Sequence, residues 1–160
     1  MAAWALRDRS DTLLEPAFGD GVFLDAAFNR FSALGNDTPT VIGVELQPAV
    51  FSKYADSAPT SFAGCCKDFM ECSEKIAVSA VVGNPPYVRL RNLKAEDRAR
   101  AIDRMAHYKI KMLSSGSLWM PFTIHASNML APNGRMAFVL PFEITYVKYS
   151  YPLWLSLIHI

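Results

Sequence analysis

The fold is decided by residues 12–21, which read Thr12-Leu13-Leu14-Glu15-Pro16-Ala17-Phe18-Gly19-Asp20-Gly21. The first four residues predict a short buried strand, and the proline and two glycines that follow predict a tight turn. Apolar residues then recur at helical spacing over residues 22–28. A strand, a glycine turn and a helix in this order begin a βαβ unit. Its helix presents free N–H groups that suit a carboxylate or a phosphate.

Strands and helices continue to alternate along the chain. Further strands are predicted at 40–45, 61–64, 78–82 and 135–140, and helices at 48–56, 95–106 and 118–130, with a Pro-Asn-Gly turn at 132–134. This alternation predicts a mainly parallel α/β sheet of about five strands with helices on both faces. Right-handed crossovers place the carboxyl ends of such strands on one rim, where ligands bind.

Composition indicates a single globular domain without a metal site and without a membrane-spanning segment. The chain has 160 residues, 51% hydrophobic and 19% charged, with a formal net charge of +1. Its three cysteines form no Cys-x-x-Cys pair, so we expect reduced thiols, no metal site and a cytoplasmic location. No apolar run approaches the ~20 residues that span a bilayer.

The predicted rim carries residues suited to an adenosine-containing cofactor. The turn lacks the third glycine of a dinucleotide fingerprint, because Leu24 stands there, so a ligand without a pyrophosphate is favoured. Glu45 ends the second strand, where a carboxylate can accept hydrogen bonds from ribose hydroxyls. Asp68 and Phe69 follow the third strand, where they can accept from an adenine amino group and pack against its ring.

Asn84-Pro85-Pro86-Tyr87 directly follows the fourth predicted strand. Two prolines fix two successive φ angles, so the loop is rigid and presents an amide oxygen, a backbone carbonyl and an aromatic face. The lone pair of a planar amino group such as adenine N6 is delocalised. Two acceptors for its N–H groups would make the nitrogen more nucleophilic, while a tyrosine stacks on the extruded base. The pattern therefore favours methyl transfer without a metal.

Together these motifs resemble the N6-adenine DNA methyltransferases of the Eco57I-like and TaqI-like restriction–modification group. Residues 15–21 resemble family motif I, Glu45 motif II, Asp68 with Phe69 motif III, and residues 84–87 motif IV. Residues 117–122 resemble motif V, although Ser117 stands where the family more often has an acidic residue. The resemblance implies a Rossmann-like S-adenosylmethionine-dependent methyltransferase fold.

The resemblance also implies roles for individual residues. S-adenosyl-L-methionine would be held by Glu15, Pro16, Ala17, Phe18, Gly19, Asp20, Gly21, Glu45, Asp68, Phe69 and Asn84. The implied catalytic residues are Asn84, Pro85, Pro86 and Tyr87, and the implied substrate contacts are Tyr87, Phe122, Arg89 and Arg91. The implied substrate is DNA, with a specificity or nuclease domain or subunit as a further partner.

A basic segment follows the catalytic loop. Residues 89–111 hold eight Lys and Arg against three Asp and Glu, a net +5. These side chains either contact the DNA backbone or form a solvated helix face.

Two further expectations concern the extent of the chain. Residues 1–154 are expected to be an incomplete catalytic core, without the N-terminal motif X and without a target-recognition domain. Residues 155–160 are expected to be a tail of uncertain origin, because they match nothing expected of the family. The same motifs leave open a protein-glutamine or RNA amino-group methyltransferase. They also leave open a non-catalytic cofactor-binding fragment that needs a partner.

Overall fold

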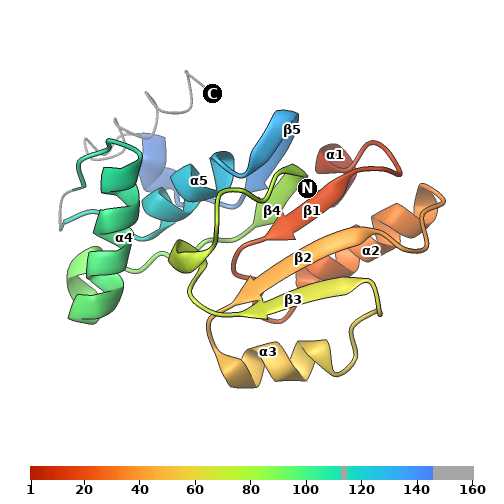
Figure 1. Cartoon of the computed structure of the whole chain (residues 1–160), viewed down its shortest axis with the longest axis horizontal. Coiled ribbons are helices and arrows are strands. Elements are labelled where there is room, and N and C mark those ends of the chain that lie inside the picture. Colours follow the sequence, from red (N-terminus) through yellow and green to blue (C-terminus); the bar gives the residue numbers. More distant parts are fainter. Residues whose placement is uncertain (113–114, 146–160) are drawn as a thin grey trace.

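A computed structural model describes residues 1–112 and 115–145. It contains one sheet of five strands in the order β3-β2-β1-β4-β5, and every paired neighbour is parallel (Figure 1). The strands are β1 (Thr12–Glu15), β2 (Thr40–Glu45), β3 (Phe62–Cys66), β4 (Val78–Gly83) and β5 (Leu130–Phe138). The predicted parallel α/β architecture is confirmed.

The central strand β1 lies between β2 and β4 and is covered on both faces. Leu13 pairs with Val41 on one side and with Ala80 on the other. Leu13 and Leu14 point to opposite faces, and each is at most 1% exposed. A parallel strand that is buried on both faces requires consecutive apolar residues, which this segment supplies.

Helices cover the two faces of the sheet. The helices are α1 (Ala2–Ala5), α2 (Val22–Ala33), α3 (Pro48–Ala55), α4 (Ala95–His107) and α5 (Trp119–Ser127), with 3-10 turns at Phe69–Glu71, Leu90–Asn92 and Phe142–Thr145. One apolar core joins the sheet to α1, α2 and α3, around Leu24, Phe31 and Tyr54. A second core joins the opposite face to α4 and α5, around Phe69 and Phe122.

The structure differs from the sequence prediction around β5. A helix was predicted to reach residue 130, but α5 ends at Ser127 and Leu130 already pairs with Val78. The predicted turn at residues 132–134 lies inside β5, where the register shifts so that Ala80 pairs with Arg135. The turn residues thus form a bulge within one strand, with Asn133 in the left-handed region at φ 63°.

A buried ion pair ties the N-terminal segment to β5. The Arg135 guanidinium donates to the Ala5 carbonyl and to Asp11 Oδ2, both at 2.6 Å. Asp11 Oδ2 also accepts the backbone N–H groups of Arg7 and Asp8. Although burial opposes it, these hydrogen bonds and the arginine charge hold the pKa of Asp11 below its usual value. Among the residues that the structure describes, no helix is long and apolar enough to cross a membrane.

Candidate active site

The carboxyl ends of β1, β2 and β4 bring the predicted motifs together on one edge of the sheet. The Phe18 N–H donates to the Val44 carbonyl at 3.1 Å, joining the turn after β1 to the end of β2. A Cβ added at Gly83 would lie 3.4 Å from Pro16 Cδ, so the chain before the Asn-Pro-Pro-Tyr loop passes closely beside that turn. The two loops therefore line one region.

Glu45 organises the turn after β1. Its carboxylate is 7% exposed and accepts the Gly19 N–H at 3.0 Å and the Gln47 N–H at 2.8 Å, one on each oxygen. Gly19 has φ 53°, a conformation that a glycine adopts without strain. A carboxylate accepts about four hydrogen bonds, so Glu45 keeps acceptor capacity for a ligand.

Phe18 and Gly21 serve core packing. Phe18 is 4% exposed, and its ring centroid lies 5.3 Å from that of Tyr54 and 5.8 Å from that of Phe62. A Cβ at Gly21, where φ is 81°, would lie 2.1 Å from Tyr54 Cε2. The Phe18 ring thus packs on the α2–α3 side of the molecule, where Tyr54 also lies close against Gly21.

Glu15 is a buried carboxyl beneath the turn. It is 1% exposed, and its Oε2 has no hydrogen-bond partner among the described residues. Burial raises its pKa to about 9, opposed by a hydrogen bond from the Leu24 N–H and aided by the negative charges of Asp25 and Glu45. Glu15 is therefore protonated at neutral pH.

Asp68 and Phe69 lie where β3 leads into the next loop. Asp68 caps the 3-10 turn, since its Oδ1 accepts the Met70 N–H at 2.9 Å. Its Oδ2 accepts from Arg100 Nε at 3.0 Å. Phe69 is 2% exposed, and its ring lies 5.1 Å from that of Phe122. The ring of Phe69, in the segment that resembles motif III, therefore contacts the ring of Phe122, in the segment that resembles motif V.

A cavity of about 280 Å³ unites these elements. This volume is near the lower end for small-molecule sites. The predicted site residues among its lining are Pro16, Ala17, Glu45, Asp68, Phe69, Pro86 and Phe122. The other lining residues, which sequence reasoning missed, are Leu46, Gln47, Lys67, Met70, Val88, Leu93, Asp97 and Leu118. Most of these are neighbours of a motif in sequence. Leu93 and Asp97 reach the cavity through the fold alone.

Of the Asn-Pro-Pro-Tyr loop, Pro86 lines this cavity, whereas Asn84, Pro85 and Tyr87 are not among the lining residues. Val88 also lines the cavity, Pro85 is buried, and Asn84 is exposed. Tyr87 is 45% exposed, and its hydroxyl lies 2.5 Å from Asn84 Oδ1 and 2.8 Å from the Val139 carbonyl. A hydroxyl has one proton to donate, so these two acceptors share it.

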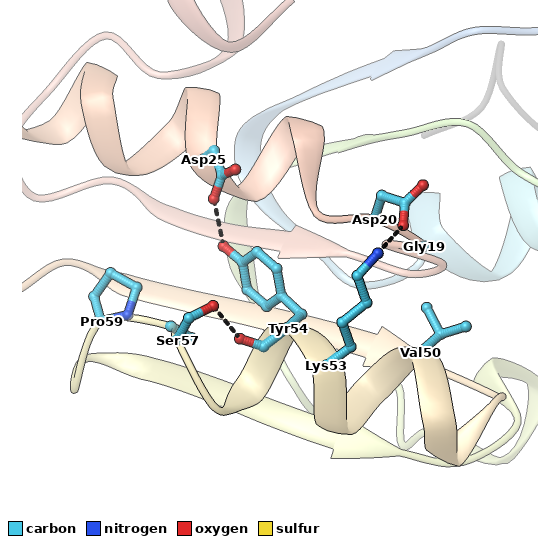
Figure 2. Close-up of a pocket in the computed structure, with 9 residues that line it drawn as sticks. Gly19, Asp20, Asp25, Val50, Lys53, Tyr54, Ser57 and Pro59 are labelled. Atoms are coloured by element: carbon cyan, nitrogen blue, oxygen red, sulfur yellow. Dashed lines mark hydrogen bonds and ion pairs between the residues drawn. The ribbon is translucent and has the colours of Figure 1, made fainter.

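Gly19 and Asp20 line a different cavity, on the α2–α3 side of the turn. This cavity has a volume of about 210 Å³. Among its lining residues, Lys53 is directed toward Asp20 and the Tyr54 hydroxyl toward Asp25 (Figure 2). The ammonium-to-carboxylate distance is 3.3 Å, and both of those side chains are more than three-quarters exposed. The turn after β1 therefore separates two cavities. Glu45, Asp68 and Phe69, which were predicted to bind an adenosine group, line the larger cavity described above.

Three arginines of the predicted basic segment contact the protein's own acidic or carbonyl groups. Arg100 contacts Asp68, as described above. Arg104 donates to Glu74 Oε2 at 2.8 Å and to the Met70 carbonyl at 2.7 Å. Arg91 is exposed, and Arg89 Nη1 donates to the Ser115 carbonyl at 3.4 Å. The segment is thus a less cationic surface than its composition predicts.

Ser117 contacts the chain that directly follows the Asn-Pro-Pro-Tyr loop. It is 2% exposed, and its Oγ donates to the Val88 carbonyl at 3.2 Å. The Leu118 N–H donates to that carbonyl at 2.8 Å. Ser117 thus buttresses the chain after Tyr87. Among the described residues, no group of three or more His, Cys, Asp and Glu side chains could hold a metal ion.

The sheet order and the position of the cavity at the strand ends define a Rossmann-like methyltransferase fold. Two solved structures share it. The modification subunit assigned to a type I restriction enzyme of Vibrio vulnificus YJ016 matches 90% of this chain and 33% of its own, with TM-score 0.67 and 14% identity. A protein of Thermoplasma acidophilum assigned as a methyltransferase matches 96% of this chain and 52% of its own, with TM-score 0.57 and 16% identity.

The chain belongs to the Eco57I restriction-modification methylase family, whose model matches residues 44–154. It is similar to the type II methyltransferase M.AccI of Acinetobacter calcoaceticus, with 26% identity over 94% of this chain and 27% of the relative. It is also similar to M.BstVI of Geobacillus stearothermophilus, with 27% identity over 86% of this chain and 30% of the relative. The chain thus spans less than a third of the length of these relatives. The family resemblance stated from the motifs is confirmed.

Proposed function

We propose that this chain is the catalytic core of a restriction–modification methyltransferase that methylates N6 of adenine in DNA. The observation that carries the proposal is the cavity between the Glu45, Asp68 and Pro86 segments, which joins carboxylates and aromatic walls to the Asn-Pro-Pro-Tyr loop. Membership of a methylase family and similarity to two type II methyltransferases support the reaction class and DNA as the substrate.

The charge of the cavity fits S-adenosylmethionine better than a dinucleotide. Three carboxylates (Glu45, Asp68 and Asp97) and one ammonium (Lys67) line it. Carboxylates accept hydrogen bonds from ribose hydroxyls and from an adenine amino group, and they repel a pyrophosphate. Phe69 and Phe122 add the apolar walls that a purine requires. When bound, the cofactor supplies an electrophilic methyl group on a sulfonium.

Each residue then has a defined task. Glu45, with its remaining lone pairs, would accept from the ribose, and Asp68 from the adenine amino group. The turn at residues 15–21 would hold the methionine part. The turn leads directly into the start of α2, where a carboxylate is favoured. These assignments follow the order of the motifs along the chain.

The Asn-Pro-Pro-Tyr loop would activate the target amine. The Asn84 amide oxygen and the Pro85 carbonyl each accept one N6 hydrogen, which concentrates the lone pair on nitrogen. The nitrogen would then be placed to take the methyl group that the cofactor would supply from its sulfur, and the surplus N6 proton would pass to solvent. The Tyr87 hydroxyl occupies one lone pair of Asn84 Oδ1 and leaves the second for the base. The Tyr87 ring stacks on the base.

Sequence recognition, and any nuclease, are proposed to reside in another domain or subunit. The similarity in fold to a modification subunit of a multi-subunit restriction enzyme supports such a partner. In this chain, Arg89 and Arg91 follow the catalytic loop and are proposed to contact phosphates beside the extruded base, a contact without sequence preference.

A methyl-transfer assay with the full 160-residue chain tests the proposal. Tritiated S-adenosylmethionine is offered with DNA, structured RNA and a release-factor protein, and labelled DNA is digested to nucleosides. Label in N6-methyl-2′-deoxyadenosine from the DNA is the expected result. Label in glutamine or RNA would replace the substrate assignment. Cofactor binding without any transfer would support a fragment that needs a partner.

Asn84→Ala tests the catalytic loop directly. Transfer should be abolished while binding of S-adenosylhomocysteine, measured by calorimetry, is unchanged, because the amide oxygen contacts the target base. Asn92→Ala, at an exposed asparagine of the next turn, is the matched control and should transfer normally. Normal transfer by Asn84→Ala would refute the loop assignment.

A further inference from the structure

Arg100 of α4 lies at the centre of a cluster of carboxylates behind the cavity. Its Nε is 3.0 Å from Asp68 Oδ2 and 3.4 Å from Glu71 Oε1, and another guanidinium nitrogen contacts Asp97 Oδ1. The Asp68 side chain is 14% exposed and that of Arg100 is 35% exposed. Asp68 and Asp97 both line the cavity, whereas Arg100 and Glu71 do not.

The Asp68 carboxylate is held at both oxygens. The Met70 N–H binds Oδ1 at 2.9 Å and Arg100 binds Oδ2. A carboxylate has about four acceptor positions, so two positions remain for a ligand in the cavity. The two fixed contacts determine the direction of those remaining lone pairs.

We propose that Arg100 is a positioning residue that makes the cavity select a purine with an exocyclic amino group over one with a keto group. This inference rests on the proposed function, because it takes the Asp68 side of the cavity as the place of the cofactor's adenine. Arg100 acts through Asp68 and does not itself contact the purine.

The physical reason is the direction in which the Asp68 carboxylate points. Arg100 faces Asp68, Asp97 and Glu71 together. Without the guanidinium, the three carboxylates would repel one another, and Asp68 would turn away from its present direction. A carboxylate accepts hydrogen bonds, which matches an amino group and does not match a keto oxygen. Loss of Arg100 should therefore reduce discrimination between the two ligands.

Arg104, one helical turn later, offers a matched control. It donates to the carbonyls of Met70 and Cys72 and to Glu74, so it holds the backbone of the same loop without contacting Asp68. A purely structural role for α4 arginines would give both positions the same effect on ligand choice. If Arg100 positions Asp68, only the Arg100 substitution should change which ligand is preferred.

The experiment measures the affinity of the full chain for S-adenosylhomocysteine and for S-inosylhomocysteine, its keto counterpart, by calorimetry. The unaltered chain should prefer the amino ligand. Arg100→Met should weaken its binding about tenfold, as expected for a partly exposed charge-assisted hydrogen bond, and leave the keto ligand almost unchanged. Arg104→Met should lower the melting temperature and keep the preference. Arg100→Lys should retain part of the preference for the amino ligand, because lysine keeps the positive charge but lacks the planar, forked hydrogen-bond donors of arginine.

The outcomes separate the inference from the proposed function. No binding of S-adenosylhomocysteine by the unaltered chain refutes the cofactor site and the inference together. Binding with the amino preference retained in a folded Arg100→Met chain refutes the role of Arg100 and leaves the cofactor site standing. If Arg100→Met does not fold, Arg100→Lys decides, since a preference equal to that of the unaltered chain overturns the inference.

Discussion

Glu15→Gln should remove a pH-dependent loss of stability. The Glu15 carboxyl has an ordinary pKa of 4.5 and a folded-state pKa of about 9, chiefly because it is buried. Between these values the unfolded chain is deprotonated at this position and the folded chain is protonated. The folded state therefore binds one more proton, and the free energy of unfolding falls as pH rises, by about 1.4 kcal/mol per pH unit.

The magnitude follows from that window. At pH 7 the Glu15 carboxyl lowers the free energy of unfolding by about 3 kcal/mol. Between pH 7.0 and 8.5 it should lower it by about 2 kcal/mol more. Glutamine does not titrate. Burial lowers the pKa of His125 to about 4, so its stability contribution changes below this window. Other groups titrate alike in both chains and cancel in the comparison.

Urea denaturation at pH 7.0 and 8.5, followed by circular dichroism, measures the effect. The unaltered chain should lose about 2 kcal/mol more than Glu15→Gln over this interval. Glu71→Gln, at a half-exposed carboxyl, should behave like the unaltered chain. Equal pH dependence of the unaltered chain and Glu15→Gln would show that Glu15 is ionised in the folded state, and the burial argument would be refuted.

Three further changes have defined outcomes. Gly21→Ala should lower the free energy of unfolding by about 2–4 kcal/mol in urea denaturation, because Gly21 has φ 81° and an added Cβ would meet the Tyr54 ring. The control Gly35→Ala should lower it by only about 1 kcal/mol, because Gly35 has a similar φ of 74° but open space around its Cβ position. Asp11→Asn should cost about 1.5–3 kcal/mol at pH 7. Because the folded-state pKa of Asp11 is lowered, the difference should shrink as pH falls below the ordinary value of 3.8, and a constant difference would contradict the ion pair. Glu45→Ala should weaken S-adenosylhomocysteine binding by about 1.5–3 kcal/mol in calorimetry, and unchanged affinity would reject its ribose role.

Much of the fold was predictable because its signals are local. The bounds predicted for β1 and β2 agree with the structure, since each is a short apolar run ended by a turn or a charged residue. The end of α5 and the start of β5 were predicted wrongly. Leu130 continues a helical apolar pattern, but its pairing with Val78 of β4 places it in the sheet. A contact between segments distant in sequence overrides the local pattern there.

The site was predictable in its motifs and less so in the tasks of single side chains. Glu45, Asp68 and Pro86 do share one cavity, as the rule for the carboxyl ends of parallel strands requires. Phe18 lies in the motif I segment, yet its ring belongs to the core beside α3. Residues 155–160, predicted to be a tail, lie outside the described residues.

By itself, the sequence determined the order of strands and helices along the chain and the residues that end β1 and β2. Hydrophobic periodicity and turn chemistry act between near neighbours, so they can be read directly. Only the tertiary structure decided that Arg100 binds Asp68, 32 positions away, and that Glu15 is buried with one oxygen that has no hydrogen-bond partner among the described residues. Burial and charge pairing depend on which distant segments meet, and no local pattern records that.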